Sequence, residues 1–442
     1  YLEAGKARMK VLIDGMNLSL SEGTGVATYT RNLAAALKEM RHEVYVLYGA
    51  NKPRTGDPIA REAVFFDPRA GKLRGGRLKR AWQMIPRPGQ TKPYQIPIRH
   101  VVREPLAEGM PKFDQLWNSK ALYKLAPTWF SLTGRMVELP NLMGVDVAHW
   151  TYPIPVRVKG AKNYYTIHDV VPLRLPYTTL DNKLYYAKVI RKIVQTADRI
   201  VTVSNNSLRD IVDMFDVDED RIHNTYQSVI LPSTSMEMPY SELGDFLKNV
   251  YNLNIKNYLL FYSAIEPKKN VRRLVDAYLA SDANIPLVIA GKAGWIDDDD
   301  IFEERQTTGS KQKVANIRIL WRNGPGKHVV RMQYLPFGNL VRMIRGARAV
   351  IFPSIYEGFG LPIAEAMLCG TPVVTSDIGA MREIAGEAAV LVDPYDEQSI
   401  RRGIENICAD EDLAKSCAKF GLQRATAFSQ SSYCERLAPL YQ

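Results

Sequence analysis

The chain has 442 residues, more than one ordinary hydrophobic core supports, which predicts two or more domains. Hydrophobic residues make up 46% and charged residues 24%, values that exclude a disordered or collagen-like chain. Four cysteines, all in the last fifth of the chain and without CxxC spacing, are too few for a disulfide scaffold, and no apolar run reaches the roughly 18 residues of a membrane-spanning helix. We therefore expect a globular cytoplasmic protein in which residues 1–8 are an expression remnant and Met9 opens the first strand.

The net charge of +11 is concentrated in one stretch of the chain. Residues 52–103 carry 13 lysines and arginines against 3 acidic residues, whereas the rest is nearly neutral. Many prolines and glycines predict a loop-like insertion there, with some helix around 78–84. Two interpretations stay open: a solvated loop, or a patch for anionic lipid or an acidic acceptor. The candidate membrane-binding residues of this stretch are Arg74, Arg77, Lys79 and Arg80.

Short β-branched runs alternate with amphipathic stretches, the pattern of parallel sheets flanked by helices. In the first half we predict strands at 10–14, 43–47, 146–150, 164–168 and 199–203. Helices are predicted at 26–40, 183–195 and 207–215. Residues 230–240 lack periodicity and contain two prolines, which predicts a linker.

A second α/β series follows the predicted linker. Its strands are predicted at 258–262, 287–290, 317–320, 329–334, 349–352, 373–375 and 390–392. Its helices are predicted at 272–280, 339–345 and 362–369, with further helix from 410 to 440. The pattern predicts two doubly wound domains, 9–235 and 236–424, facing across a cleft, where ligands bind beyond the carboxyl ends of the strands.

Three short motifs at predicted strand ends suit an anionic or sugar ligand. Gly23-Thr24-Gly25 opens a helix whose free amides favour an anion, but Thr28 stands where a dinucleotide fingerprint needs its third glycine. His168-Asp169 ends a strand, and Lys268-Lys269 precedes a helix, where two cations can neutralise a diphosphate. The structural alternatives are a tight turn, a capping or core histidine, and a solvated lysine pair.

The run from Phe352 to Pro394 is the most informative segment. Gly358 and Gly360 permit a tight strand-to-helix turn whose amides can face an anion or a sugar. Glu357 lies at the mouth of that turn, and Glu365 lies on the helix that follows. Both carboxylates need partners, because burying an unpaired charge is costly, and sugar hydroxyls are suitable partners.

This run resembles the retaining glycosyltransferases of family four, whose E-x7-E signature matches Glu357 and Glu365. The resemblance extends over most of the chain, through EPKKN at 266–270, TIHD at 166–169, VTVSNNS at 201–207 and GTGVATYTRNLAAAL at 23–37. It implies the GT-B fold, in which two Rossmann-like domains face each other and a C-terminal helix, here 425–442, crosses back to the first domain.

The resemblance also implies residue roles. The catalytic residues would be Glu357 and His168, which contact the transferred sugar, and Lys269, which neutralises the leaving diphosphate. The donor-binding residues would be Glu365, Lys268, Gly358, Phe359, Gly360, Leu361, Tyr334, Leu335 and Ser204. The diphosphate and the acceptor would face Gly23, Thr24, Gly25 and Asp169. Retention in this family is assigned to front-face attack with the leaving phosphate as base, so the two-carboxylate hydrolase scheme does not apply.

The implied activity is metal-independent hexose transfer from a nucleotide diphosphate sugar, without a cofactor. The segments GTG…YTRNL, HDVVPL and TYQSV look most like bacterial mannosyl- and deoxyhexosyl-transferases of O-antigen and lipopolysaccharide assembly. This implies a GDP-sugar in preference to a UDP-sugar, a glycan or lipid-linked acceptor, and a peripheral position on the inner face of the plasma membrane. Nucleic acid is not an expected partner. The acidic run 297–300 is interpreted as a solvated helix start and not as an Asp-x-Asp metal site.

The sequence departs from the family pattern at two places. Ser263-Ala264 replaces the Gly-Arg of many members, so Lys268 is the candidate substitute for the diphosphate arginine, and Gln430 stands where many relatives have Trp. The alternatives are a noncatalytic nucleotide-sugar-binding or scaffold subunit and a nicotinamide-dependent oxidoreductase, against which Thr28 counts. A sugar phosphorylase would need pyridoxal phosphate and a Schiff-base lysine that the sequence does not identify.

Overall fold

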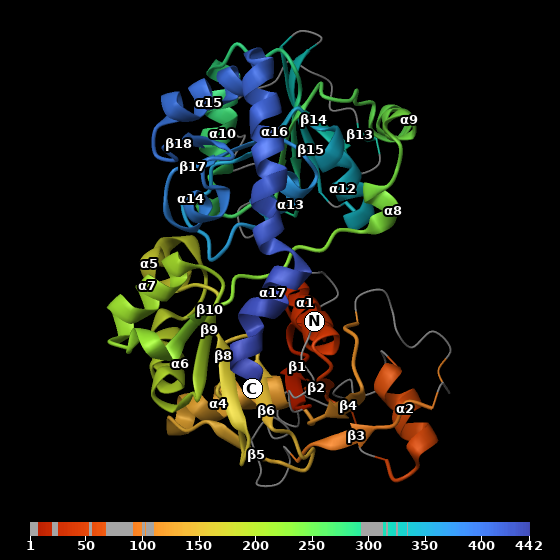
Figure 1. Ribbon diagram of the computed structural model, residues 1–442, viewed down its shortest axis with the longest axis vertical. Helices are drawn as coiled ribbons and strands as arrows, with labels where there is room; N and C mark the ends of the chain where they lie inside the picture. Colours follow the sequence, from red (N-terminus) through yellow and green to blue (C-terminus); the bar gives the residue numbers. More distant parts are fainter. Residues whose placement is uncertain are drawn as a thin grey trace.

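The computed structural model describes residues 8–19, 25–52, 55–67, 92–99, 102, 110–292, 313–314, 317–323, 326–333 and 335–442. These residues form two α/β domains stacked end to end, each built on an eight-stranded sheet (Figure 1). The predicted pair of doubly wound domains is therefore confirmed.

The first sheet has the order β10-β9-β8-β6-β1-β2-β4-β3, and every neighbouring pair is parallel except β3 with β4. Val11 and Ile13 on the central strand β1 pack with α1, and Leu12 packs on the opposite face with α4 and α6. Both faces are thus buried, as a parallel sheet requires. The strands are β1 (Lys10–Asp14), β2 (Glu43–Tyr48), β3 (Tyr94–Ile96), β4 (Gln115–Asn118), β6 (Val147–Trp150), β8 (Lys162–Thr166), β9 (Arg199–Thr202) and β10 (Ile222–Asn224).

The helices of this domain are α1 (Gly25–Glu39), α2 (Pro58–Phe66), α4 (Leu122–Thr133), α5 (Val171–Arg174), α6 (Lys183–Thr196) and α7 (Asn205–Phe215). α1, α6 and α7 agree with the predicted helices within two residues, whereas α2, α4 and α5 were not predicted. A small parallel pair, β5 (Val137–Pro140) with β7 (Val156–Lys159), stands apart from the main sheet. The expected loop-like insertion at 52–103 contains α2 and the edge strand β3, whereas its predicted helix at 78–84 lies outside the described residues.

The second sheet has the order β13-β14-β15-β12-β11-β16-β17-β18. Its strands are β11 (Leu259–Tyr262), β12 (Leu287–Ala290), β13 (Lys313–Val314), β14 (Ile317–Asn323), β15 (Lys327–Met332), β16 (Ala349–Phe352), β17 (Val373–Ser376) and β18 (Val390–Val392). The helices are α8 (Ser233–Met236), α9 (Tyr240–Tyr251), α10 (Val271–Ala280), α12 (Phe337–Gly346), α13 (Leu361–Leu368), α14 (Gly379–Ala385), α15 (Glu397–Ala409) and α16 (Glu411–Ala425). β13, β14 and β15 pair antiparallel, and the other strands pair parallel.

The chain passes between the domains twice. The first passage follows β10, and the second runs from α16 through a short 3-10 helix (Thr426–Phe428) into α17 (Gln430–Leu437), which packs on α1 (Figure 1). The predicted return of the C-terminal helix is confirmed. The predicted linker at 230–240 is wrong in extent, because α8 and the start of α9 lie inside it and α8 packs on α12.

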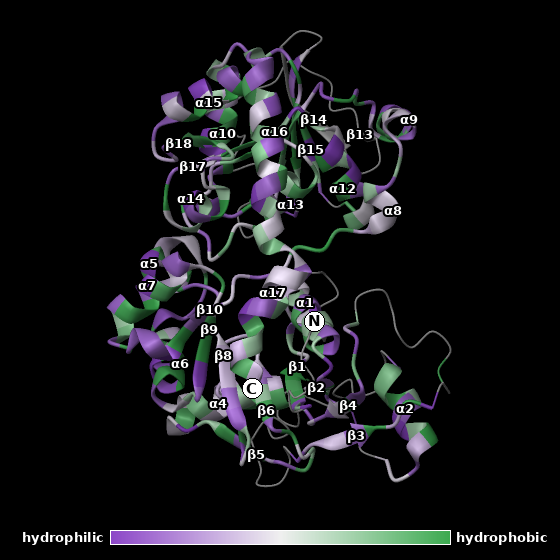
Figure 2. Cartoon of the chain, in the orientation of Figure 1, coloured by the Kyte–Doolittle hydropathy of each residue, from purple (hydrophilic) through white to green (hydrophobic). Residues whose placement is uncertain are grey.

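Hydropathy follows this arrangement. Figure 2 shows green along the central strands of the second domain and a mixture of green and purple on the helices around them. The four-residue strands β11, β12, β16 and β17 are buried along their whole length. No helix in the described part of the chain is both long and apolar enough to cross a membrane.

Five further 3-10 turns lie at Asn17–Ser19, Pro176–Thr178, Glu219–Arg221, Pro267–Lys269 and Ala438–Tyr441.

Candidate active site

The loops after β8 and β16 bring the histidine and glutamate motifs together across the cleft. A Cβ atom on Gly358 would lie 2.4 Å from the carbonyl oxygen of His168, so this approach requires glycine. Ser207 on α7 donates its hydroxyl to the same carbonyl oxygen at 2.8 Å. β8 ends at Thr166, so His168 lies in the loop and not in the strand that we predicted.

Glu357 is the charged centre of the second-domain side. Its side chain is buried, and its Oε1 accepts hydrogen bonds from the Lys269 ammonium and the Ser354 hydroxyl, each at 2.6 Å. Burial alone raises the pKa of this carboxyl, but the nearby Lys269 and Lys268 cations outweigh burial and hold the pKa of Glu357 below its usual value. The carboxylate is therefore ionised at neutral pH.

The lysine loop is fixed in place by Asn270. This residue has a left-handed φ of 62° between the 3-10 turn and α10, and its side-chain amide donates to the carbonyls of Pro353 at 3.0 Å and Pro394 at 2.7 Å. It thus ties the loop after β11 to the loops after β16 and β18. Asn270 is the last residue of the EPKKN motif, and its only sequence signal for this role is an asparagine at a helix start.

Lys268 lies close to acidic groups of both domains. Burial lowers the pKa of its ammonium, but the carboxylates of Glu357, then Asp169 and Glu266, outweigh burial and raise the pKa above its ordinary value. Asp169 belongs to the first domain, so this cation interacts across the cleft. Lys268 and Lys269 together place two positive charges beside Glu357.

Glu365 has a different environment from Glu357. It lies on α13, is 7% exposed, and its Oε2 accepts the Tyr262 hydroxyl at 2.9 Å. Burial raises the pKa of Glu365 to about 7, and the Tyr262 hydrogen bond only partly opposes this. Gly360 is the N-cap of α13, and its φ of 94° is a left-handed conformation that suits glycine.

His168 is held as a neutral imidazole. Its Nε2 lies 2.9 Å from the carbonyl oxygen of Thr151, and because a carbonyl only accepts, Nε2 carries the proton and Nδ1 has the lone pair. Burial lowers the pKa of His168, and the Tyr29 ring contacts the imidazole edge-on at 4.8 Å between centroids. The Nδ1 atom of His168 can therefore accept a hydrogen bond from a hydroxyl group.

The starts of α1 and α13 also meet at this site. A Cβ on Gly25 would lie 3.6 Å from Leu361 Cδ1, so the amino ends of the two helices are neighbours from opposite domains. Both helix dipoles favour an anion there.

The other predicted donor residues take packing positions. Phe359 is buried against Phe428, with ring centroids 5.3 Å apart, and Leu335 packs on the core of the second domain. The Ser204 hydroxyl accepts from the Ser207 amide at 3.0 Å and caps α7. Donor contacts of these residues stay predictions. Outside the described residues lie Gly23, Thr24 and Tyr334, the patch Arg74, Arg77, Lys79 and Arg80, and the acidic run 297–300.

Two cross-domain contacts were not predicted. Asp210 on α7 accepts from Arg174 at 2.5 Å and from the hydroxyl of Tyr356, the neighbour of Glu357. The Glu383 carboxylate on α14 accepts from the backbone amides of Asn205 at 2.8 Å and Asn206 at 2.9 Å, at the start of α7. Tyr356 and Asp210, like Glu383 and Asn205, are more than a hundred residues apart, so no local sequence pattern predicts these contacts.

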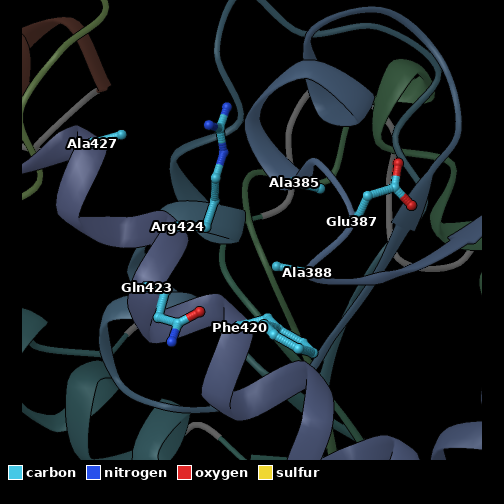
Figure 3. A pocket seen from close by; sticks show the side chains of 7 residues that line it. All are labelled: Ala385, Glu387, Ala388, Phe420, Gln423, Arg424 and Ala427. Atoms are coloured by element: carbon cyan, nitrogen blue, oxygen red, sulfur yellow. The ribbon is translucent and has the colours of Figure 1, made fainter.

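A separate hollow lies away from these loops. It has a volume of about 440 Å³ between α14 and α16 (Figure 3). The lining residues are Ala385, Glu387, Ala388, Phe420, Gln423, Arg424 and Ala427. None of them is a predicted site residue. Within the described ranges, no group of three or more His, Cys, Asp or Glu side chains could hold a metal ion.

Comparison with known proteins places this chain in a family. The family model described as Glycosyltransferase Family 4 matches residues 23–229, and that of Glycosyl transferases group 1 matches 245–424. O-antigen chain mannosyltransferase B of Escherichia coli is 32% identical over 283 residues, which cover 62% of this chain and 68% of that protein. The chain belongs to glycosyltransferase family four. It is a hexosyltransferase of the O-antigen and lipopolysaccharide type.

Other family-four relatives and folds agree. O-antigen chain mannosyltransferase RfbU of Salmonella typhimurium is 26% identical over 64% of this chain and 69% of its own. The chain spans only about a third of the serotype-specific mannosyltransferase WbdA of Escherichia coli, at 25% identity over 63% of this chain. The fold is GT-B. Sucrose-phosphate synthase of Thermosynechococcus elongatus matches with a TM-score of 0.63 at 15% identity, and the match covers 98% of this chain and 98% of that one. Anabaena HepE in complex with UDP and glucose matches with a TM-score of 0.62 at 14% identity, and the match covers 98% of this chain and 99% of that one.

Proposed function

We propose that this family-four enzyme transfers mannose or a related deoxyhexose, with retention of anomeric configuration, from a GDP-sugar in preference to a UDP-sugar. The acceptor is a glycan or a lipid-linked glycan of bacterial surface polysaccharide. The names of the relatives, O-antigen and serotype-specific mannosyltransferases, support the sugar and the acceptor class. The observation that carries the proposal is the ionised Glu357–Lys269 pair, which faces the His168 loop across a glycine contact.

The leaving diphosphate meets positive charge on several sides. Lys268 and Lys269 and the amino ends of α1 and α13 favour the negative charge that develops as the glycosidic bond breaks. Because Ala264 stands at the usual arginine position, Lys268 takes its place in this proposal. The ion pair with Glu357 orients the Lys269 ammonium before the donor binds.

Glu357 acts as an acceptor of sugar hydroxyls and not as a nucleophile. Lys269 and Ser354 both contact Oε1, which leaves Oε2 for a hydroxyl of the transferred sugar. A carboxylate with a lowered pKa is a weak base and a weak nucleophile, which supports front-face attack with the leaving phosphate as base. His168 Nδ1 accepts a second sugar hydroxyl, and Glu365 holds the ribose.

The first test is a thermal-shift panel with GDP, UDP, ADP, NAD and the corresponding sugar conjugates. A ligand at 100 times its dissociation constant stabilises the folded protein by about 2.7 kcal/mol, which raises the melting temperature measurably. We expect the largest shift with GDP and GDP-mannose, and an α-linked product by NMR after incubation with acceptor. A shift with NAD alone, or an inverted product, would contradict the proposal.

We further propose that residues 52–103 bind an anionic inner-membrane surface through Arg74, Arg77, Lys79 and Arg80. The local excess of 13 basic over 3 acidic residues supports this. Neutralising these four residues should weaken binding to phosphatidylglycerol vesicles and leave turnover of a soluble acceptor unchanged. The control neutralises four basic residues of the second domain, Lys248, Arg402, Lys415 and Lys419. Equal vesicle binding by both variants would refute the patch.

A further inference from the structure

A buried chain of hydrogen bonds lies under His168 and crosses three neighbouring strands. Asp14 ends β1, Thr151 follows β6, and His168 follows β8, and the sheet places these strands in the order β8-β6-β1. The three residues therefore lie side by side at the carboxyl edge of the sheet, where the site is built.

Asp14 holds Thr151 through two hydrogen bonds. Its Oδ2 accepts from the Thr151 amide at 2.5 Å and from the Thr151 hydroxyl at 2.8 Å, and both residues are fully buried. The other oxygen, Oδ1, accepts from the Met16 amide at 3.3 Å. One carboxyl group thus fixes the backbone after β6 and the start of the loop that leads from β1 to α1.

Thr151 passes this constraint on to His168. Its carbonyl oxygen accepts the Nε2 proton at 2.9 Å and so selects the tautomer with a free lone pair on Nδ1. The Tyr29 ring limits rotation of the imidazole from a second side, and the Tyr29 hydroxyl is itself held 2.9 Å from the Thr166 hydroxyl.

A buried carboxyl at this place is costly for the fold. The rest of β1 presents Val11, Leu12 and Ile13 to two apolar cores, and burial raises the pKa of Asp14 in spite of its hydrogen bonds. An apolar residue would continue the strand pattern at lower cost. Polar residues that violate the local pattern are expected at functional sites, which directs attention to what Asp14 orients.

We propose that Asp14 is a positioning residue that sets the tautomer and ring orientation of His168 through Thr151, so that Nδ1 faces a hydroxyl of the transferred sugar. The proposal rests on the proposed function of His168 for its catalytic consequence. The structural part, the control of the tautomer, does not depend on which sugar is transferred.

The test compares Asp14→Leu, which removes every acceptor for Thr151, with Asp14→Asn, which restores one. Nitrogen-15 NMR of the six histidines, with His168→Ala for assignment, reports which ring nitrogen carries the proton. We expect a protonated Nε2 in the unaltered protein and in Asp14→Asn, and a mixture of tautomers in Asp14→Leu. Turnover of Asp14→Leu should fall about 10- to 100-fold with an unchanged donor KM, because a small misplacement of a reacting group has that cost.

The control is Asp146→Asn, because Asp146 accepts the Lys10 amide at 2.7 Å at the opposite end of β1 and is exposed. It should leave tautomer and turnover unchanged. If Asp14→Leu does not fold, Thr151→Val removes only the threonine hydroxyl and should show the same changes at smaller size. A folded variant with the unaltered tautomer and normal turnover would overturn the proposal. If Asp14→Leu changes the tautomer but the unaltered protein itself transfers no sugar, the positioning role is supported and the proposed function is refuted.

Discussion

Glu357 and Glu365 belong to one motif, yet their surroundings give them opposite charge behaviour. Their exposed fractions are nearly equal, 8% and 7%, but the pKa of Glu357 is lowered and that of Glu365 is raised to about 7. At Glu357 the lysines Lys269 and Lys268 outweigh the effect of burial on the pKa. At Glu365 only the Tyr262 hydroxyl opposes that effect. Neighbouring charge, and not burial, decides the ionisation state of a buried carboxyl here.

The same substitution, made separately at the two glutamates, should give the largest difference in enzyme kinetics between them. Glu357→Gln removes the anion that orients Lys269 and contacts the sugar, and we expect turnover to fall about 100- to 1,000-fold, as for loss of one electrostatic contact to a transition state. Glu365→Gln should mainly raise the donor KM, because the proposed role of Glu365 is to hold the ribose and not the transferred sugar. Steady-state kinetics of both folded variants measure this. Near-normal turnover of Glu357→Gln would contradict its role.

The raised pKa of Glu365 should appear in the pH dependence of stability. The folded protein keeps this proton up to about pH 7, whereas the unfolded chain releases it near the ordinary glutamate pKa of 4.5. Stability from this group is therefore complete below about pH 4.5 and lost as pH rises to about 7, by about 3 kcal/mol.

Urea unfolding of the unaltered protein and of Glu365→Gln at each pH gives this contribution as a difference. The difference should decrease between pH 4.5 and 7 and then stay constant. The same comparison with Glu357→Gln should slope the other way at low pH, because a lowered pKa stabilises the folded state above the unfolded value. Parallel curves for both variants would refute the contrast.

A substitution of Gly358 tests whether activity requires the close contact between the Glu357 loop and the first domain. In Gly358→Ala the new Cβ would lie 2.4 Å from the His168 carbonyl, so the loops must separate. We expect turnover to fall about 10- to 100-fold, while nucleotide affinity falls less, because the proposed nucleotide-binding residues Lys268, Lys269 and Glu365 of the second domain stay in place. The control is Gly56→Ala, whose Cβ would meet nothing within 4 Å. Calorimetric titration with the nucleotide and small-angle scattering separate the two effects.

Tyr262→Phe should give the smallest effect. It removes the hydrogen bond to Glu365, so stability should fall by about 1 kcal/mol and the pKa of Glu365 should rise further. Tyr278→Phe is the matched control, because its buried hydroxyl donates to the Ile285 carbonyl at 2.9 Å and has no carboxyl partner. Both variants should lose similar stability, but only Tyr262→Phe should shift the pH curve.

Local patterns predicted the central strands of both sheets and the motifs of the site, but they missed β3, β4 and β10 toward the edges of the first sheet. Apolar runs such as those of β11 and β16 predict buried strands because both their faces are covered. The glutamate, lysine and histidine motifs were recognised from residues that follow strands, and the structure brings them together.

What the sequence did not reveal depends on partners far along the chain. The roles of Asp14, Asp210 and Glu383 arise from Thr151, Tyr356 and the start of α7, which only the tertiary arrangement places beside them. The predicted extent of the linker was wrong because two prolines in a short stretch look like loop sequence, whereas Pro232 and Pro239 directly precede the first residues of α8 and α9.

The two passages between the domains have a mechanical consequence. The Val229 amide donates to the Phe428 carbonyl at 2.9 Å, so the outgoing and returning chains are joined where they cross. The two chain passages therefore hold the domains together at one place, beside the contacts of Asp210 and Glu383. A separation of the domains that kept the Val229–Phe428 bond would be a rotation about these two residues, which is the hinge type of domain movement.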